Sequence, residues 1–452
     1  MTGAARTYAV VGGGVSGLTA AYRIRTAVGP QPEILLFDPA DRLGGVLRTE
    51  TVYGQPFDIG AEAFIVRRPE VPALLAELGL ADRQIVPTGV KTTIYSQGRL
   101  HPLPSGTLNG IPGSAESMAG LVDAATVVRI AAEPHRPMQW APGSDAAVGD
   151  VVTPRFGEQV VARSLDPMLS GVYAGSAATI GIRAAAPTLA AALDAGAPNL
   201  TEAVRKALPP GAAGPVFAAI DGGYRVLIDE LVDRVRPRRE QTAITRLEAD
   251  GRGWQLRDAG GTYWRADAVV LALPAPRAAE LLTAVAPQAA AAAARIPVAS
   301  AAVLAMGLPA ATPFPPQSGV LVATGESLHA KAITLSSRKW GGRGEVELVR
   351  LSFGRFGDDI ATATAEADLL AWAVEDLHTV FGIAADPLEF KVHRWIDAMP
   401  QYGPGHGALV AELRAGLPPT LAVAGNFLDG VGVPGCLVAA GRAAIAAVSA
   451  AS

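Results

Sequence analysis

The chain has 452 residues and a net charge of −4, from 38 Lys and Arg against 42 Asp and Glu. This length allows two or three domains around a large core, and the balanced charge gives no electrostatic case for nucleic-acid binding. A single cysteine, Cys436, excludes an internal disulfide framework and favours the reducing cytoplasm. The first predicted strand begins near residue 8, which leaves no room for a signal peptide ahead of it.

The first predicted unit is a strand, a glycine-rich turn and a helix. A β-branched run ends at Gly12, and a helical pattern begins near Gly17. With Gly14 these glycines fit G-x-G-x-x-G, which permits a tight turn, close approach of a pyrophosphate and close packing of the helix on the strand. Amides at the helix start then face the phosphate charge. The unit predicts a dinucleotide site at Gly12, Gly13, Gly14, Val15, Ser16 and Gly17.

The next segments indicate which dinucleotide binds. A predicted strand over 33–37 ends on Asp38, whose carboxylate can accept hydrogen bonds from ribose hydroxyls; a turn cap before Pro39 is the alternative. A cation and a second glycine turn follow, and this segment resembles the R-x-G-G stretch of flavoproteins. Small residues then recur over 60–63 and allow the backbone of this segment to approach a flat ring. The sequence therefore favours FAD over NAD, held also by Arg42, Gly44, Gly45, Val46, Gly60, Ala61, Glu62 and Ala63.

The middle of the chain reads as a hairpin followed by a helical insertion. Spacing predicts a helix over 69–80, hairpin strands over 91–95 and 99–103, and a loop over 104–113. Helical periodicity dominates 114–215, with a weak capping box at Ser114 and an apolar turn between helices at 169–175.

The stretch over 296–325 carries no charged side chain, as a membrane span would. Five prolines interrupt it, and each costs about 3 kcal/mol inside a helix, so it cannot supply the roughly 20 helical residues of a span. Residues 297–308 fit a buried strand better.

The nucleotide-binding pattern returns in the second half. We expect a helix over 225–235, hairpin strands over 242–247, 254–257 and 262–265, and a buried strand over 268–273. Strands dominate 296–353, a helix covers 361–380, and a strand over 421–424 precedes a helix over 435–447. The fold class is therefore mixed α/β. A Rossmann-like FAD-binding domain is discontinuous (1–84, 218–290 and 393–452), with a mainly β substrate-binding domain (85–113 and 291–392) and a helical domain (114–217).

A glycine-rich turn precedes the last helix. Gly430, Gly432 and Gly435 satisfy G-x-G-x-x-G, but Pro434 occupies the turn and no strand ending in an acid follows. We interpret it as a helix whose positive end points at a ligand, with an ordinary glycine-rich helix start as the alternative. Beside a flavin ring such a helix would raise the reduction potential. Because no separate nicotinamide domain is evident, an oxidase is favoured over a reductase.

Three segments carry a family resemblance. They are Gly-Val-Tyr-Ala-Gly at 171–175, the stretch 394–406 with Ala-Met-Pro-Gln-Tyr and Gly-His, and 425–433. Together they resemble the oxygen-dependent porphyrinogen oxidases of haem synthesis, within the flavin amine oxidase superfamily. The short, alanine-rich chain is most similar to the coproporphyrinogen III oxidases of Gram-positive bacteria, especially actinobacteria. Ser176 and Ala177 depart from the family, where an acid and a proline are frequent.

The resemblance implies that coproporphyrinogen III is converted to coproporphyrin III in three two-electron steps, with oxygen as acceptor and hydrogen peroxide as by-product. The flavin carries the chemistry, so no catalytic side chain is predicted. Further FAD contacts are implied at Ile244 (through its backbone), Asn426, Val431, Gly432 and Val433.

Four propionates on this substrate call for cations in the pocket. Lys91 matches a basic position that relatives place near a propionate; a solvated strand lysine is the alternative. The six histidines lack paired metal spacing, so no metal site is predicted. Protoporphyrinogen IX oxidation, a flavin amine oxidase or desaturase, and a non-catalytic FAD-fold binding protein stay as alternatives. The family also implies a transient contact with the next haem-pathway enzyme, and peripheral membrane contact stays open.

Overall fold

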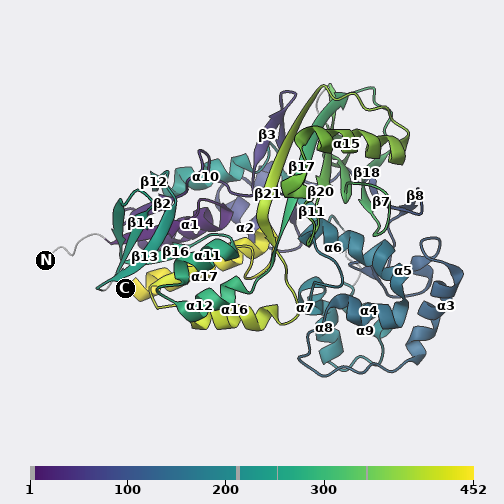
Figure 1. Ribbon diagram of the computed structural model, residues 1–452, viewed down its shortest axis with the longest axis horizontal. Coiled ribbons are helices and arrows are strands. Elements are labelled where there is room, and N and C mark those ends of the chain that lie inside the picture. The colour runs from purple at the N-terminus through teal and green to yellow at the C-terminus, as the bar shows by residue number, and fades with distance from the viewer. Residues whose placement is uncertain (1–5, 210–213, 252, 343–344, 452) are drawn as a thin grey trace.

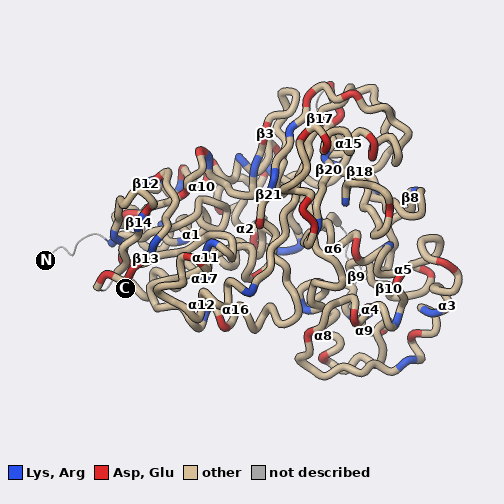
Figure 2. Tube along the Cα trace, in the orientation of Figure 1, with Lys and Arg blue, Asp and Glu red and all other residues tan. Residues whose placement is uncertain are grey.

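The computed structural model describes residues 6–209, 214–251, 253–342 and 345–451. Figure 1 shows an α/β part that holds both termini, a part built on a long-stranded sheet, and a helical part beneath that sheet. Positive and negative residues are interspersed along the trace in all three parts (Figure 2).

A five-stranded parallel sheet forms the centre of the α/β part. Its order is β12-β2-β1-β16-β22, and every neighbouring pair is parallel. The strands come from three separated stretches of the chain: β1 (Thr7–Val11), β2 (Glu33–Phe37), β12 (Arg238–Glu240), β16 (Ala268–Leu271) and β22 (Leu421–Val423). All of β16 is buried, because both faces of the sheet are covered.

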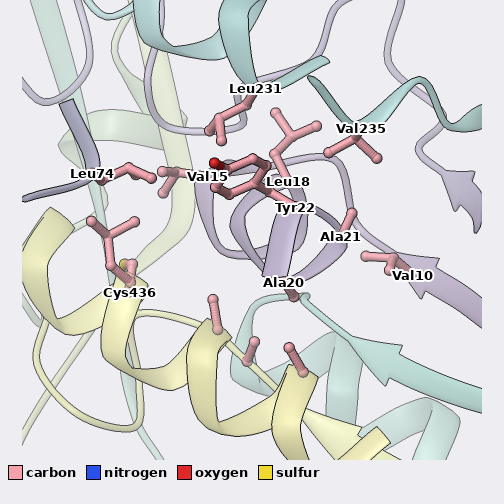
Figure 3. Close-up of a cluster of buried hydrophobic side chains, with 14 of the residues drawn as sticks. Val10, Val15, Leu18, Ala20, Ala21, Tyr22, Leu74, Leu231, Val235 and Cys436 are labelled. Atoms are coloured by element: carbon pink, nitrogen blue, oxygen red, sulfur yellow. The ribbon is translucent and has the colours of Figure 1, made fainter. Parts of the chain in front are cut away.

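Alternate side chains of each strand feed two different cores. Val10 packs with α1 (Val15–Val28), α2 (Glu70–Glu77), α10 (Arg225–Val235) and α17 (Val433–Ala451), as Figure 3 shows. Ala9 and Val11 face the other core. That core includes the meander β13 (Ile244–Asp250), β14 (Gly253–Asp258) and β15 (Tyr263–Ala266), with α11 (Ala275–Leu282), α12 (Pro287–Ala294) and α16 (His406–Ala415). This confirms the predicted Rossmann-like α/β architecture.

A seven-stranded mixed sheet forms the second part. Its order is β21-β17-β20-β19-β18-β7-β8, and only β18 and β7 pair in parallel. One face packs on α15 (Glu366–Phe381) through Leu369, Ala373 and Leu377. The strands are β7 (Lys91–Ser96), β8 (Arg99–Pro102), β17 (Val298–Pro309), β18 (Gln317–Val322), β19 (Ala332–Leu335), β20 (Val346–Phe353) and β21 (Glu389–Pro400), with α13 (Ser336–Trp340) and α14 (Ile360–Ala363) beside them.

Short strands connect the parts: β3 (Thr49–Val52) with β4 (Gln55–Asp58), and β5 (Phe64–Ile65) and β6 (Gln84–Ile85) on either side of β11 (Phe217–Ile220). The helical part holds α3 (Ala124–Ala132), α4 (Val148–Phe156), α5 (Glu158–Val160), α6 (Asp166–Tyr173), α7 (Ile182–Ala185), α8 (Pro187–Asp194) and α9 (Leu200–Ala207).

Four local expectations were wrong. Residues 104–113 contain a small hairpin, β9 (Thr107–Leu108) and β10 (Ile111–Pro112), rather than only loop. No capping box forms at Ser114, whose carbonyl accepts from Ser117; Asp123 and Asn199 cap α3 and α9 instead. Much of 169–175 belongs to α6, which ends at the left-handed Ala174. The helix expected over 361–380 is divided into α14 and α15.

The apolar stretch at 296–325 holds β17 and β18, which confirms the strand interpretation. Among the described residues, α17 is long and apolar enough to cross a membrane by length and composition, although 56% of its tested window is buried inside the protein. It packs against α1 in the core of Figure 3, as a core helix does.

Candidate functional site

Three glycine-rich turns meet at the carboxyl ends of β1 and β2. Gly12 has φ +108°, and a Cβ there would lie 2.2 Å from the Ala272 carbonyl oxygen. A Cβ on Gly17 would lie 1.8 Å from the Gly12 oxygen. Both positions therefore require glycine for the packing of α1 on β1.

The second and third turns are stacked on the first. Gly44 N–H donates to the Gly13 carbonyl at 2.8 Å, and a Cβ on Gly45 would lie 3.0 Å from the Gly14 Cα. A Cβ on Gly60 would lie 1.9 Å from the Val46 oxygen. The structure thus brings the predicted segments 12–17, 44–46 and 60–63 into backbone contact.

Gly14 differs from its neighbours in a way that indicates a ligand. Its φ is −72°, and a Cβ there would meet no atom closer than 3.7 Å. The protein's own packing therefore does not require glycine at this position, whereas close approach of a pyrophosphate does. Gly14 is also the N-cap of α1 and has no side chain to bond the first-turn amides, which leaves them for an anion. The turn fits a dinucleotide phosphate.

Asp38 follows the end of β2, and both of its carboxylate oxygens accept hydrogen bonds from backbone amides. One carboxylate oxygen accepts from Gly13 N–H at 2.7 Å, and the other accepts from Ala40 N–H at 2.9 Å. The turn cap is therefore formed, and the carboxylate lies beside the phosphate turn, where a ribose would follow. Arg42 donates to carbonyls of its own turn, those of Leu43, Gly45 and Leu47, and so shapes the second glycine turn.

Glu62 is tied to the seven-stranded sheet. Its carboxylate accepts from the Ser336 hydroxyl and from the Lys339 ammonium, each at 2.8 Å. Burial raises the pKa of Glu62, but Lys339 and Arg350 outweigh it and lower the pKa to about 2. Both donors lie on α13. The carboxylate therefore anchors the 60–63 turn to α13.

The two ends of the chain meet at this site. Val15 of α1 and Val433 and Cys436 of α17 share one buried cluster, and Figure 3 shows Val15 near Cys436. The Ser16 hydroxyl hydrogen-bonds the Cys436 thiol, whose pKa burial raises to about 11. Helix α17 begins at Val433, two residues before its predicted start. The first turns of α1 and α17 therefore lie side by side, as the flavin interpretation requires.

Other predicted residues are placed as follows. Ile244 begins β13 with its side chain in the core, which leaves only its backbone for a ligand. The Asn426 side chain donates to the Ala398 carbonyl at 2.9 Å, and Val431 and Gly432 precede α17 on partly open backbone. Lys91 is the exposed first residue of β7. Strand alternation groups it with Tyr95, which packs in the core under α15. Its contact with a propionate stays a prediction.

Sequence reasoning missed the cations that face the 58–62 segment. Lys339 pairs with Glu62, and Arg350 donates to the Asp58 carbonyl at 3.3 Å. Arg350 lies on β20 opposite Ala305 and Thr334, on the face away from Val349 and Leu351, which pack under α15. Burial lowers the pKa of Arg350. The available signal was Arg350 itself, a charged residue between Val349 and Leu351 in a mainly apolar strand. No cluster that could hold a metal occurs among the described residues.

Comparison with known proteins decides the family. The family model "Flavin containing amine oxidoreductase" matches residues 15–448. The chain belongs to this family. Within it, the chain groups with the coproporphyrinogen III oxidases. It is 65% identical over 445 residues to the coproporphyrinogen III oxidase of Mycobacterium tuberculosis, covering 98% of both chains, and 63% identical to that of Mycobacterium leprae, covering 97% of both.

A solved structure supports the same fold. The crystal structure of a candidate protoporphyrinogen oxidase from Exiguobacterium superposes with a TM-score of 0.86 at 26% identity, and the match covers 97% of this chain and 98% of the other. The chain is therefore a flavin-containing oxidoreductase with the mixed α/β fold of this family.

Proposed function

We propose that this flavoprotein oxidises coproporphyrinogen III to coproporphyrin III, with FAD as its flavin and oxygen as the acceptor. Relatives that share 65% of its residues over nearly the whole chain carry this activity in their names. The observation that carries the proposal in the structure is the meeting of three glycine turns with the first turn of α17. Rings and phosphates of one dinucleotide can contact all of these segments at once.

Each segment has a distinct task in this proposal. The amides at 14–17 hold the pyrophosphate, Asp38 holds the ribose, and 60–63 and 431–433 border the ring. When bound, the flavin supplies the acceptor for hydride from the porphyrinogen. The protein holds the substrate over the ring and excludes water, so positioning is its main contribution. Glu62 is fully paired with Lys339 and Ser336, so it keeps its negative charge and holds the turn in place rather than exchanging protons.

Gly14→Val tests the cofactor assignment. The backbone at Gly14 is extended and sterically open, so the variant should fold but lose FAD. Gly441→Val is the matched control, since a Cβ at Gly441 would meet no atom within 4 Å and this glycine lies about two turns along α17. Absorbance at the flavin bands against protein concentration gives the occupancy. Gly14→Val purified with stoichiometric FAD would refute the assignment.

Anaerobic bleaching of the flavin spectrum tests the substrate. Coproporphyrinogen III should bleach it, and readmitted oxygen should restore it with formation of hydrogen peroxide. Protoporphyrinogen IX, measured side by side, should react with a lower kcat/KM because it has two propionates fewer. Faster reaction of protoporphyrinogen IX would overturn the substrate choice, and no bleaching by either would overturn the function.

Lys91→Glu tests the propionate contact. Replacing a cation that pairs with a propionate by an anion should raise KM for coproporphyrinogen III at least tenfold, about 1.4 kcal/mol, with little change in kcat. Lys206→Glu, an exposed lysine in the last turn of α9, is the control. Equal KM for both variants would remove Lys91 from the pocket. A cytoplasmic location, contact with the next haem-pathway enzyme and peripheral membrane contact stay predictions.

A further inference from the structure

The stretch 401–406 is the place where the three parts of the structure are joined. Gln401 N–H donates to the Pro297 carbonyl of the sheet region, and its side-chain amide donates to the Tyr173 carbonyl of α6. The Tyr402 carbonyl accepts from Gly181 N–H in the helical part at 2.8 Å. The family resemblance includes this stretch, yet none of its residues has a role in the proposed function so far.

The Tyr402 hydroxyl bridges both ends of the loop that leads into α17. It donates to the Asn426 carbonyl at 2.6 Å and accepts from Gly430 N–H at 3.0 Å. Its side chain is only 6% exposed. One hydroxyl therefore closes a loop of five residues, 426–430, that has no strand or helix of its own.

His406 holds the middle of the same loop. Its Nε2 lies 2.9 Å from the Phe427 carbonyl oxygen, which can only accept, so Nε2 carries the proton. The ring stacks on Tyr402 with centroids 3.8 Å apart and planes 21° apart. Burial lowers the pKa of His406, which keeps the ring neutral. The stacking therefore fixes the directions in which the Tyr402 hydroxyl and the His406 Nε2–H point.

We propose that Tyr402 and His406 are positioning residues that fix the loop 426–430 and, through it, the first turn of α17 against the flavin. The inference rests on the proposed FAD site. Gly430 is the last loop residue with a positive φ, +132°, and a Cβ on Gly435 would lie 2.4 Å from its carbonyl oxygen. A shift of Gly430 therefore moves the start of α17 directly. That helix start is the group expected to raise the potential of the bound flavin.

Tyr402→Phe tests the hydroxyl, because it removes both hydrogen bonds and keeps the stacked ring. The loss of both bonds should weaken FAD binding roughly tenfold, about 1.4 kcal/mol. The midpoint potential of the bound FAD should fall by about 30 mV, the equivalent of tenfold for a two-electron couple. The visible flavin spectrum should change as well. Tyr22→Phe is the matched control, since Tyr22 is 8% exposed and its hydroxyl donates to Glu77 away from the loop.

A second pair of variants tests the histidine. His406→Phe keeps a stacked ring without a donor and should shift the potential in the same direction as Tyr402→Phe. His406→Gln restores an N–H donor and should recover part of the wild-type potential. Folding of each holoenzyme is checked by circular dichroism, so a loss of fold is distinguished from a loss of position.

The wild-type holoenzyme gives an independent readout. Hydrogen exchange of the peptide over 424–432 should show a protected amide at Gly430, although the loop has no regular structure. Exchange of that amide at the rate of an unfolded chain would overturn the proposal. So would a folded Tyr402→Phe with wild-type FAD affinity, potential and spectrum. Neither result depends on the substrate, so failure of the porphyrinogen assay leaves this test intact.

Discussion

The ion pair between Glu62 and Lys339 should couple the flavin turn to the seven-stranded sheet. Its atoms lie 2.8 Å apart, and the side chains are 13% and 22% exposed. The pKa of Glu62 falls from 4.5 to about 2. At about 1.36 kcal/mol per pH unit, this corresponds to about 3 kcal/mol in favour of the charged carboxylate. Because the folded pKa is the lower one, this stabilisation is complete above about pH 4.5 and is lost as the pH falls toward 2.

A double-mutant cycle measures the coupling at neutral pH. Lys339→Met removes the ammonium from the Glu62 carboxylate and leaves it the Ser336 hydroxyl and the charge of Arg350, and Glu62→Gln leaves the ammonium facing a neutral amide. Unfolding of 452 residues carries an entropy of about 0.95 kcal/mol/K, so 3 kcal/mol lowers Tm by about 3 °C. The double variant should lose about 2 °C less than the two single losses together, because the second change removes an already unpaired charge.

Thermal unfolding of the FAD-loaded proteins, followed by flavin fluorescence, is the assay. Lys206→Met, at an exposed lysine of α9, is the control and should change Tm by under about 0.5 °C. FAD occupancy of Lys339→Met should also fall, because the turn at 60–63 loses its anchor. Additive Tm changes within about 0.5 °C would refute the coupling and reduce the pair to a surface contact.

Two other predictions follow from buried carboxyl groups. Burial raises the pKa of Asp58 from 3.8 to about 7, so Asp58 takes up a proton on folding and stability falls as the pH rises from about 4 to about 7. In Asp58→Asn, Tm should lose this dependence on pH and should exceed the wild-type Tm at about pH 8. An unchanged dependence of Tm on pH would contradict the prediction. Glu133 is 0% exposed and accepts from Leu200 N–H, Thr201 N–H and the Thr201 hydroxyl while paired with Arg155. Glu133→Ala should therefore destabilise the helical part by about 3–5 kcal/mol, seen as faster proteolysis within 114–208, and wild-type resistance there would exclude it.

The sequence was sufficient for the features that depend on backbone conformation. Gly12 and Gly17 have no room for a Cβ, so their spacing alone predicts the turn and the helix that follows. The apolar run of β16 likewise predicts a strand buried on both faces. Such features are local in the chain, and their residue types follow from sterics within a few positions.

Features that depend on contacts between residues far apart in the chain could not be predicted from the sequence. Glu62 and Lys339 are 277 positions apart, and nothing near either residue indicates its partner. The membrane-like composition of α17 was overlooked because alanine, rather than leucine, makes it apolar, and only the packing on α1 shows why. The glycine pattern predicts a turn at 169–175, but Gly171 falls inside α6 rather than after its end at Tyr173.

The difference between features set by local backbone and features set by distant side chains explains how one fold serves different substrates. The flavin cradle consists mostly of backbone, since Gly44 and Gly13 or Ala61 and Val46 meet through N–H and C=O groups. Side chains contribute mainly by holding backbone segments in place: Lys339 pairs with Glu62 of the 60–63 turn, and the Tyr402 hydroxyl bonds the loop at 426–430. We therefore expect the substrate contacts to come from the seven-stranded sheet and the helical part, whose side chains can vary without moving the cradle. The motifs therefore predict the backbone turns of the proposed cofactor site, whereas a prediction of propionate recognition requires the assembled sheet.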